Sequence, residues 1–332
     1  MKVLLTGITG FLARRIAHDL LAAGHHVRGS LRDRGKGEAV RALMPEAAAH
    51  RLEFVELDLT KDDGWNEAAQ GTDAVIHTAS PFPIMQTPAD PQTIIRPAVE
   101  GTERALRAAK AAGVARVILT SSVVAVENGP RPEDDRPRDE RDWSSADHPN
   151  ANAYVRSKTE AERAAWAFAE AEGLLLTTIC PGLVMGPPLG DEAGTSLGII
   201  ARILSGKDPM VPPVAFEIVD VRDVSRAHVV ALETPATAGR RFLLVAGKMW
   251  FADIARIVAA EAPHRGISTR TAPRLLVRAL AMMDPALRGL VPVLGRNEPI
   301  SGEKARIELG IDYIPPDDAV RAAARAMIAL DA

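Results

Sequence analysis

The sequence predicts an α/β protein with a doubly wound parallel sheet and a smaller, mostly helical C-terminal part. Short apolar runs alternate with helical patterns over the first 180 of the 332 residues. A glycine-rich turn separates the first apolar run from the first helical pattern, and polar side chains follow several of the later runs. Parallel strands need helical crossovers, so this alternation favours a parallel sheet over an antiparallel one.

The expected strands are short apolar runs at residues 2–6, 26–31, 52–57, 74–77, 116–120 and 174–179. The helices between them end at glycines, which take up the left-handed conformation past a last turn. We expect a first helix through Leu12, Ile16, Leu20 and Leu21 that Gly24 ends, an alanine-rich helix over about 97–112, and a helix over 152–172. Ligands of such sheets bind at the carboxyl ends of the strands.

Proline interrupts the pattern after residue 180. There we expect one helical run near 197–204, a strand at 242–246 and a mostly helical remainder. The polar, proline-bearing stretch 127–150 is expected to be a solvated loop that precedes the helix over 152–172.

Composition indicates a soluble globular protein. Forty Lys and Arg against 43 Asp and Glu give a net charge of −3, so neither nucleic acid nor an anionic membrane is the expected partner. Cys180 is the single cysteine, which excludes an internal disulfide and fits a reducing compartment. No run is long enough for a signal-peptide core or a membrane span, and the eight histidines show no zinc-site spacing. We therefore expect a cytoplasmic protein without a metal, either a monomer or a homodimer.

The turn after the first strand is typical of a dinucleotide site of the Rossmann type. Gly7 permits a tight turn, Gly10 lets a pyrophosphate approach the backbone, and Ala13 is small enough for the helix to pack on the sheet. The helix N-terminus offers free N–H groups and a positive dipole end to phosphates. A tight turn without a ligand would use the same residues, so the flanking strand and helix carry the prediction.

The end of the second strand bears on the choice between NAD and NADP. An acidic residue there accepts from the ribose hydroxyl of NAD, whereas arginine suits the 2′-phosphate of NADP. Asp33 keeps NAD possible, but Arg32, with Arg34 and Lys36 behind it, favours NADP. A solvated basic turn is the alternative. Asp58, followed by Leu59, could accept from the adenine amino group or cap the next helix.

Tyr154 and Lys158 stand four residues apart, on one face of an expected helix. A nearby cation favours the phenolate, so we expect Lys158 to lower the pKa of Tyr154 toward a value useful for proton transfer. Ser121 and Ser122 end the fifth strand, where a hydroxyl can polarise a carbonyl that is about to accept hydride.

These motifs resemble those of the extended short-chain dehydrogenases/reductases over essentially the whole chain. The Thr-Gly-x-x-Gly-Phe turn, the Thr-Ser-Ser strand end, Tyr154-x-x-x-Lys158 and the stretch 180–187 stand in family order and spacing. Stretches 77–82, 97–102 and 219–224 resemble the branch of dihydroflavonol reductases, cinnamoyl-CoA reductases and carbonyl (aldehyde) reductases. Ala13 stands at the third glycine position, a departure that this branch tolerates.

The resemblance implies that Ser122, Tyr154 and Lys158 are the catalytic triad and that Arg32 binds the 2′-phosphate. The expected reaction is hydride transfer from NADPH to a ketone or aldehyde, a small hydrophobic or aromatic carbonyl compound. Tyr154 would protonate the developing alkoxide, Ser122 would hydrogen-bond it, and Lys158 would also bind the nicotinamide ribose.

The residues expected to bind NADP(H) follow the strand ends and the glycine-containing segments: Thr6, Gly7, Thr9, Gly10, Phe11, Leu12, Arg32, Lys36, Asp58, Leu59, Thr78, Ala79, Ser80, Thr120, Ser121, Tyr154, Lys158, Pro181, Gly182, Leu183 and Val184. Those expected to contact substrate are mostly apolar: Ser80, Phe82, Ser122, Val123, Val124, Tyr154 and Met185. We expect a dinucleotide-binding domain over 1–180 with about 214–247, and a substrate-binding part over 181–213 and 248–332.

Two alternatives stay open. The first is an NAD-dependent epimerase or dehydratase of the same fold, which Arg32 and the apolar loop 185–189 disfavour because the loop lacks a basic clamp for a nucleotide sugar. The second is a non-catalytic, cofactor-sensing Rossmann protein, which would not need Ser122, Tyr154 and Lys158 together.

Overall fold

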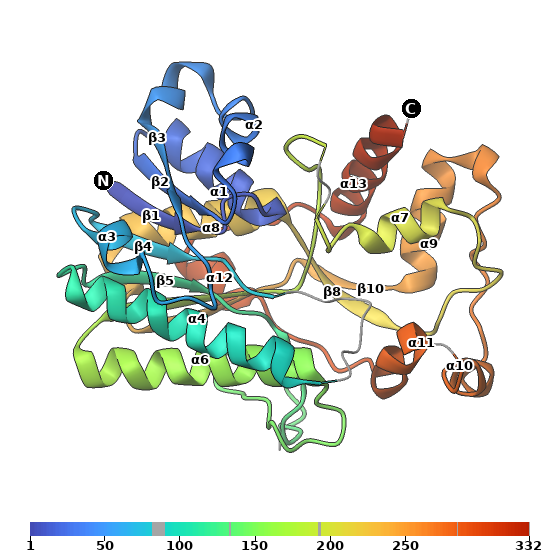
Figure 1. Cartoon of the computed structure of the whole chain (residues 1–332). Helices are drawn as coiled ribbons and strands as arrows, with labels where there is room; N and C mark the ends of the chain where they lie inside the picture. Colours follow the sequence, from blue (N-terminus) through green and yellow to red (C-terminus); the bar gives the residue numbers. More distant parts are fainter. Residues whose placement is uncertain (82–89, 133, 192–193, 284, 332) are drawn as a thin grey trace.

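A seven-stranded parallel sheet forms the centre of the molecule (Figure 1). The computed structural model describes residues 1–81, 90–132, 134–191, 194–283 and 285–331. In spatial order the strands are β3 (Leu52–Glu56), β2 (His26–Leu31), β1 (Lys2–Thr6), β4 (Ala74–His77), β5 (Arg116–Thr120), β6 (Leu175–Pro181) and β9 (Arg240–Leu244). The order reverses between β1 and β4, which makes the sheet doubly wound and confirms the predicted fold class.

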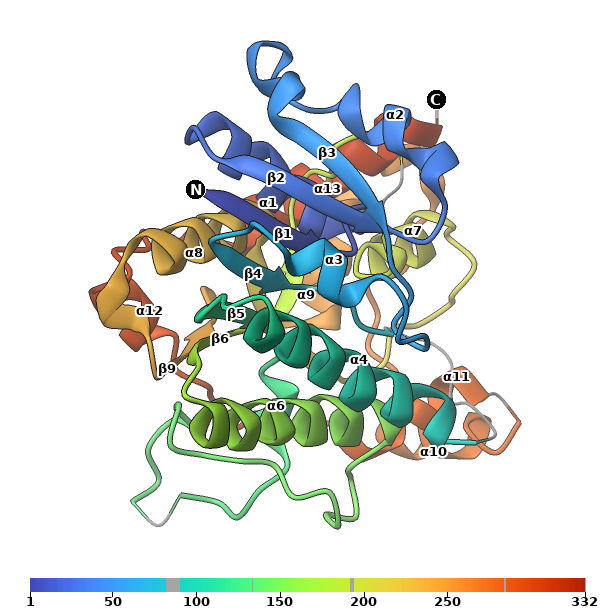
Figure 2. The ribbon, with the colours of Figure 1, turned by 60° about the vertical axis from the view of Figure 1, so that its left-hand side comes forward.

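Helices cover both faces of this sheet. On one face α4 (Gln92–Ala111) and α6 (Ala153–Glu172) run side by side in both views (Figures 1 and 2). On the other face α1 (Phe11–Ala22) lies with α8 (Val221–Glu233). Adjacent residues of β1 pack into the two different layers, Val3 and Leu5 into one core cluster and Leu4 into the other. This alternation explains why the buried strands read as continuous apolar runs.

The C-terminal part contains a second, three-stranded sheet that the sequence did not predict. It consists of β10 (Gly247–Trp250), β8 (Ala215–Asp220) and β7 (Leu183–Met185). The segment expected in the dinucleotide-binding domain, 214–247, is therefore shared, because β9 lies in the large sheet and β8 in the small one. The remaining helices are α2 (Gly37–Arg41), α3 (Trp65–Ala69), α5 (Val124–Glu127), α7 (Gly198–Leu204), α9 (Phe251–Glu261), α10 (Arg274–Leu280), α11 (Pro285–Leu290), α12 (Glu303–Glu308) and α13 (Pro316–Asp331).

The start of α4 differs from the prediction. The helix begins at Gln92, so that Pro97 lies inside it rather than at its first turn. The carboxylate of Asp90 accepts a hydrogen bond from the Gln92 N–H at 2.9 Å, which forms a turn just before the N-cap residue Pro91. Within the described ranges, no helix combines the length and the hydropathy that a membrane span requires.

Candidate active site

A cavity of about 660 Å³ lies along the carboxyl ends of the central strands. Its lining includes most of the residues predicted to bind a dinucleotide: Gly7, Thr9, Gly10, Phe11, Leu12, Arg32, Asp58, Leu59, Thr78, Ala79, Ser80, Thr120, Ser121, Tyr154, Lys158, Pro181, Gly182 and Val184. Three predicted residues lie elsewhere. Thr6 is buried below the cavity, Lys36 is exposed in the turn after β2, and Leu183 lines a neighbouring cavity.

The glycine turn brings backbone close to the cavity. Gly7 has φ +72°, and a Cβ placed on it would lie 3.1 Å from the Cα of Ala79. A side chain at this position would therefore be strained and crowded. No side chain caps α1 at Gly10, so the N–H groups of its first turn can be satisfied by a ligand.

Thr6 and His77 hold the strand ends beneath this turn. The Thr6 hydroxyl accepts hydrogen bonds from the backbone N–H groups of Thr78 and Ala79, both at 3.1 Å, and lies 2.9 Å from His77 Nδ1. Burial lowers the pKa of His77 to about 3, so the imidazole is neutral. Both residues therefore support the cavity wall from below.

Basic and acidic side chains at the ends of β2 and β3 have different surroundings. Arg32 lines the cavity, whereas Asp33 accepts from the Gly35 N–H at 2.8 Å and thereby caps its own turn. Hydrogen bonds from Thr60 are the largest cause of a lowered pKa at Asp58, and the charge of Arg32 adds to it. The positive charge of Arg32 thus lies at the end of the cavity that the Asp58 carboxylate lines.

The predicted triad meets at the opposite end of the cavity. Helix α6 begins at Ala153 because the Asn152 side chain accepts from the Val155 N–H at 2.9 Å. Tyr154 and Lys158 then face the end of β5, where the Ser122 hydroxyl forms a hydrogen bond with the Tyr154 phenol. Lys158 and Ser122 are 8% and 7% exposed, whereas Tyr154 is half-buried and lines both this cavity and the next one.

The expected lowering of the Tyr154 pKa by Lys158 is wrong in this structure. Burial raises the pKa of the phenol above its ordinary value of 10.0, and the hydrogen bond with Ser122 offsets only part of this effect. Burial also lowers the pKa of Lys158 to about 8. Both shifts have the same physical cause, since removal from water disfavours each charged form. The phenol is therefore protonated at neutral pH, which is the form that a proton donor needs.

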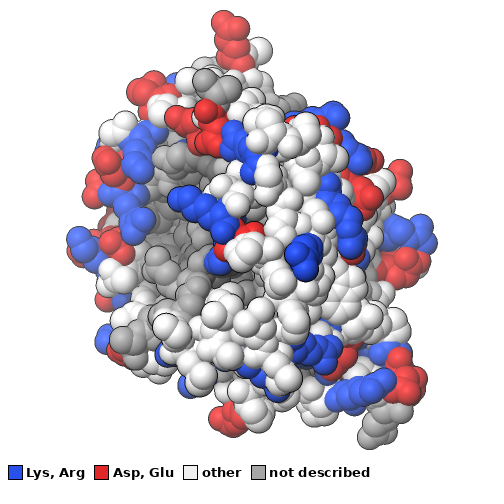
Figure 3. Space-filling model, turned by 90° about the vertical axis from the view of Figure 1, so that its right-hand side faces the viewer, with Lys and Arg blue, Asp and Glu red and all other residues white. Residues whose placement is uncertain are grey.

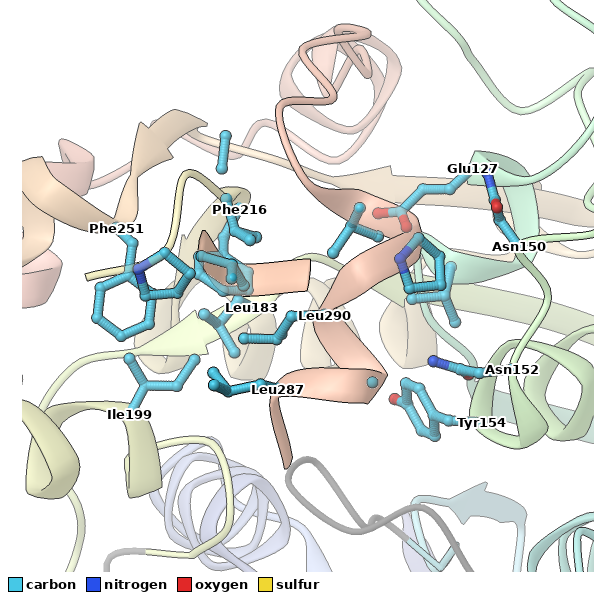
Figure 4. Close-up of a pocket in the computed structure, with 18 of the residues that line it drawn as sticks. Glu127, Asn150, Asn152, Tyr154, Leu183, Ile199, Phe216, Phe251, Leu287 and Leu290 are labelled. Atoms are coloured by element: carbon cyan, nitrogen blue, oxygen red, sulfur yellow. The ribbon is translucent and has the colours of Figure 1, made fainter. Parts of the chain in front are cut away.

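A second cavity of about 380 Å³ adjoins the first and shares Ser122, Tyr154 and Gly182 with it. One end is apolar, with Phe216 and Phe251 beside Leu183 and Ile199 (Figure 4). The Phe216 and Phe251 rings pack with their centroids 6.0 Å apart. The other end carries polar side chains near Tyr154, namely Glu127, Asn150 and Asn152 (Figure 4).

Glu127 is an acidic residue at this polar end of the second cavity. Burial raises the pKa of Glu127, while the charge of Arg296 opposes the shift. Arg296 donates to the Asn128 side chain at 2.7 Å and to the Glu127 carbonyl oxygen at 2.5 Å. Sequence reasoning missed Glu127, Asn150 and Asn152 as lining residues. The sequence feature that could have indicated them is the polar stretch before α6, in which or next to which all three residues lie.

The residues predicted to contact substrate are divided by the structure. Ser122, Val123, Val124 and Tyr154 line the second cavity, whereas Ser80 lines the first. The assignment of Met185 is wrong, because its side chain is fully buried in the main core cluster and lines neither cavity. Phe82 lies outside the described residues. Within the described part of the chain, no cluster of His, Cys, Asp or Glu could hold a metal ion.

Comparisons with known proteins give a consistent result. Residues 3–245 match the NAD dependent epimerase/dehydratase family. The chain is 36% identical to cinnamoyl-CoA reductase 1 of Petunia hybrida over 281 residues, which cover 82% of each protein. It is 35% identical to tetraketide alpha-pyrone reductase 2 of Arabidopsis thaliana, covering 72% of this chain and 76% of the relative.

Solved structures resemble the chain along its whole length. The Candida albicans Gre2 structure in complex with NADPH superposes with a TM-score of 0.82 at 26% identity and full coverage of both chains. Vestitone reductase from alfalfa superposes with a TM-score of 0.76 at 26% identity, covering 99% of this chain and 98% of the other.

Proposed function

The chain belongs to the NAD dependent epimerase/dehydratase family, in its branch of cinnamoyl-CoA and Gre2-type reductases, and we propose that it reduces a ketone or aldehyde with NADPH. The cinnamoyl-CoA, tetraketide alpha-pyrone and vestitone relatives named above are reductases, so the protein is an oxidoreductase. One observation carries the proposal of carbonyl reduction. The hydrogen-bonded pair of Ser122 and Tyr154 stands where the dinucleotide-sized cavity meets the apolar one.

The first cavity fits NADPH. It follows the carboxyl ends of the strands, it has a glycine turn that a Cβ would crowd, and it includes the uncapped start of α1. We propose that Gly7, Gly10 and the first turn of α1 hold the pyrophosphate and that Arg32 holds the 2′-phosphate. Asp33 is engaged in capping its own turn, so support for NAD from this residue is weak.

NADPH, when bound, supplies the hydride. Tyr154 donates its phenol proton to the carbonyl oxygen as the carbonyl carbon accepts hydride, so that the substrate becomes an alcohol. The Ser122 hydroxyl holds that oxygen by a hydrogen bond. Lys158, with a pKa of about 8, remains charged at neutral pH and stabilises the phenolate that proton transfer leaves on Tyr154.

The second cavity suits a hydrophobic or aromatic carbonyl compound. Its apolar end offers aromatic and aliphatic surface, whereas Glu127, Asn150 and Asn152 offer hydrogen bonds beside Tyr154. A nucleotide sugar, the substrate expected of an epimerase, would need basic side chains for its pyrophosphate. Arg202, the basic residue among the described lining residues, is ion-paired with Asp208 at 2.6 Å. The epimerase alternative is therefore less well supported.

The test is NADPH consumption by the purified protein with a panel of aromatic and aliphatic ketones and aldehydes. We expect oxidation of NADPH with at least one hydrophobic carbonyl compound and recovery of the matching alcohol. No consumption across the panel, with NADPH binding intact, would favour a cofactor-sensing protein. Release of an epimerised or dehydrated sugar nucleotide would favour the other alternative. Cytoplasmic location and a monomeric or homodimeric state stay predictions.

A further inference from the structure

A fully buried carboxylate lies behind the proposed catalytic residues. Glu162 stands on α6 four residues beyond Lys158, which itself stands four residues beyond Tyr154. This spacing places the three side chains one above another on a single helix face. Glu162 is 0% exposed and lines neither the 660 Å³ nor the 380 Å³ cavity, so it has no place in the reaction described above.

Glu162 joins α6 to three neighbouring strands. The Ser121 hydroxyl, at the end of β5, donates to its Oε2 at 2.6 Å, and the Thr178 hydroxyl of β6 donates to its Oε1 at 2.9 Å. Arg241 of β9 donates to the same two oxygens, from Nε at 2.7 Å and from Nη2 at 3.0 Å. A buried charge is costly unless it is paired and hydrogen-bonded, and here both oxygens are engaged.

The guanidinium of Arg241 is itself fixed in place. It donates from Nη1 to the Asp142 carbonyl oxygen at 2.6 Å, and its central carbon lies 3.9 Å from the centroid of the Trp143 ring. Arg241 therefore ties the segment that precedes α6 to the same carboxylate. The ion pair has one defined geometry, because Arg241 is bidentate and stacked as well as paired.

The surroundings of Lys158 show what this carboxylate can do. The titratable groups that interact with the ammonium are Glu162 on its own helix, Cys180 on β6 and His77 at the end of β4, and Tyr154 lines the same cavity one helical turn earlier. Burial lowers the pKa of Lys158 to about 8, while Cys180 and Glu162 oppose that shift. Burial raises the pKa of the Cys180 thiol to about 12 and lowers that of His77 to about 3, so both are neutral at neutral pH. Glu162 therefore supplies the negative charge that offsets the burial of the ammonium.

We propose that Glu162 is a positioning residue of the reductase, which fixes Ser121 and the backbone leading to Ser122 and keeps Lys158 charged behind Tyr154. The expected effect on catalysis rests on the proposed reductase function. The expected effect on the protonation of Lys158 does not depend on that function. When the Glu162 charge is lost, Lys158 loses its proton at a lower pH. The hydrogen bond between Ser121 and Glu162, which holds the backbone next to Ser122, is weakened as well.

The direct test follows the titration of Lys158 in the purified protein without added cofactor. ¹³C-labelled lysine resolves the ε-carbons of the eight lysines by NMR, and the signal that disappears in Lys158→Met assigns Lys158. In Glu162→Gln we expect the midpoint of this titration to fall by about one pH unit or more. Thr178→Val is the matched control, because it removes a hydrogen bond to Glu162 and keeps the charge, and its midpoint should equal that of the wild type.

Equal midpoints in the wild type and Glu162→Gln would overturn the proposal. If Glu162→Gln does not fold, Glu162→Leu combined with Arg241→Met removes both charges and leaves neither alone in the core. The lower midpoint is expected in that double variant too, and an unchanged one refutes the proposal equally.

The catalytic consequence has a separate readout. In Glu162→Gln the alkaline limb of the pH profile of kcat/KM should move to lower pH, whereas a merely structural role would lower kcat/KM equally at every pH. A wild type that consumes no NADPH with any carbonyl compound would refute the proposed function, and the NMR midpoints would still decide whether Glu162 controls Lys158.

Discussion

Arg32 is the side chain on which cofactor choice depends, because it lines the cavity where Asp33 does not. Arg32→Ala should raise the KM for NADPH about 10- to 100-fold, the effect of losing a hydrogen bond to a charged group, and should change the KM for NADH little. Arg34→Ala is the matched control, since Arg34 belongs to the exposed turn and is not in the lining of this cavity. Steady-state kinetics with both cofactors checks the prediction. A wild type that prefers NADH would refute the assignment.

Phe216 should select substrates by size, because it lines the apolar end of the second cavity. Phe216→Ala removes contact surface, and lost apolar fit in such pockets costs about 1–3 kcal/mol, or 10- to 200-fold in kcat/KM. We expect kcat/KM for a bulky aromatic ketone to fall by about this much relative to a small aliphatic one. Competition kinetics with paired ketones measures the ratio.

Met185→Ala is the control for this prediction. Its side chain is fully buried in the core, so the substitution should lower the free energy of unfolding by about 2–5 kcal/mol and leave the ratio between the two ketones unchanged. The reverse result, a changed ratio with full stability, would show that Met185 and not Phe216 borders the substrate.

Among the elements, α8 makes stability depend on pH through one buried imidazole. His228 is fully buried, lies 2.8 Å from the Thr120 hydroxyl on β5 and 2.8 Å from the Val224 carbonyl oxygen, and burial lowers its pKa from 6.5 to about 4. The unfolded chain therefore takes up a proton below pH 6.5 that the folded chain refuses until about pH 4. The free energy of unfolding should fall over this range, by at most about 3 kcal/mol from this group.

His228→Gln should reduce this loss of stability. Urea unfolding at about pH 7 and about pH 5 gives the difference for each protein, and the variant should show the smaller difference. His77 adds a loss of the same sign, because burial lowers its pKa to about 3, so some acid sensitivity should remain in the variant. Equal differences in the two proteins would contradict a neutral His228 in the folded state.

The elements also show what the sequence could and could not predict. The bounds of β1, β2, β4 and β5 agree with the prediction because each is an apolar run bounded by turn residues. The predicted start of α4 was wrong because Pro97 was taken as the first helical residue. The helix in fact begins five residues earlier, at Gln92, after a turn at Asp90. The small sheet was missed because β7 has only three residues and pairs with residues of β8 that lie 35 positions further along the chain, as in the pair Leu183 and Ile218.

The same distinction holds for the site. The sequence was sufficient to find the residues that belong to short local motifs, each at one strand end or along one helix. These are Gly7, Ser122, Tyr154 and Lys158. Glu127 and Phe216 come from α5 and β8, and only tertiary packing brings them to one cavity. The shift of the Tyr154 pKa was mispredicted for a related reason, since burial is a property of the folded molecule and outweighs the local spacing to Lys158.

In the whole molecule the two cavities meet beside the C-terminal part, whose helices α10 and α11 lie on the side shown in Figure 3. That face is hollowed and carries a broad area of uncharged residues beside charged ones (Figure 3). Leu276 and Leu280 of α10 line the second cavity and are also 41% and 46% exposed. The apolar surface of the cavity thus continues to the outside, which suits the entry of a hydrophobic substrate.

Binding of NADPH should stabilise the whole fold, because the first cavity draws its lining from the ends of several strands. A ligand at 100 times its dissociation constant adds about 2.7 kcal/mol to the free energy of unfolding. We expect the melting temperature to rise with NADPH, less with NADH, and to lose this difference in Arg32→Ala. Thermal unfolding at matched ligand concentrations is the measurement, and equal shifts with both cofactors in the wild type would count against an NADP site.

The central claim is that Tyr154 protonates a carbonyl oxygen beside Ser122, and Tyr154→Phe tests it most directly. The substitution removes one hydroxyl from a site where burial keeps the phenol protonated, so folding and NADPH affinity should persist. General acid catalysis contributes about 10²–10⁴-fold, and single-turnover measurement of NADPH oxidation should show a loss of that size in the chemical step. A variant that keeps more than about a tenth of the wild-type single-turnover rate would contradict the claim.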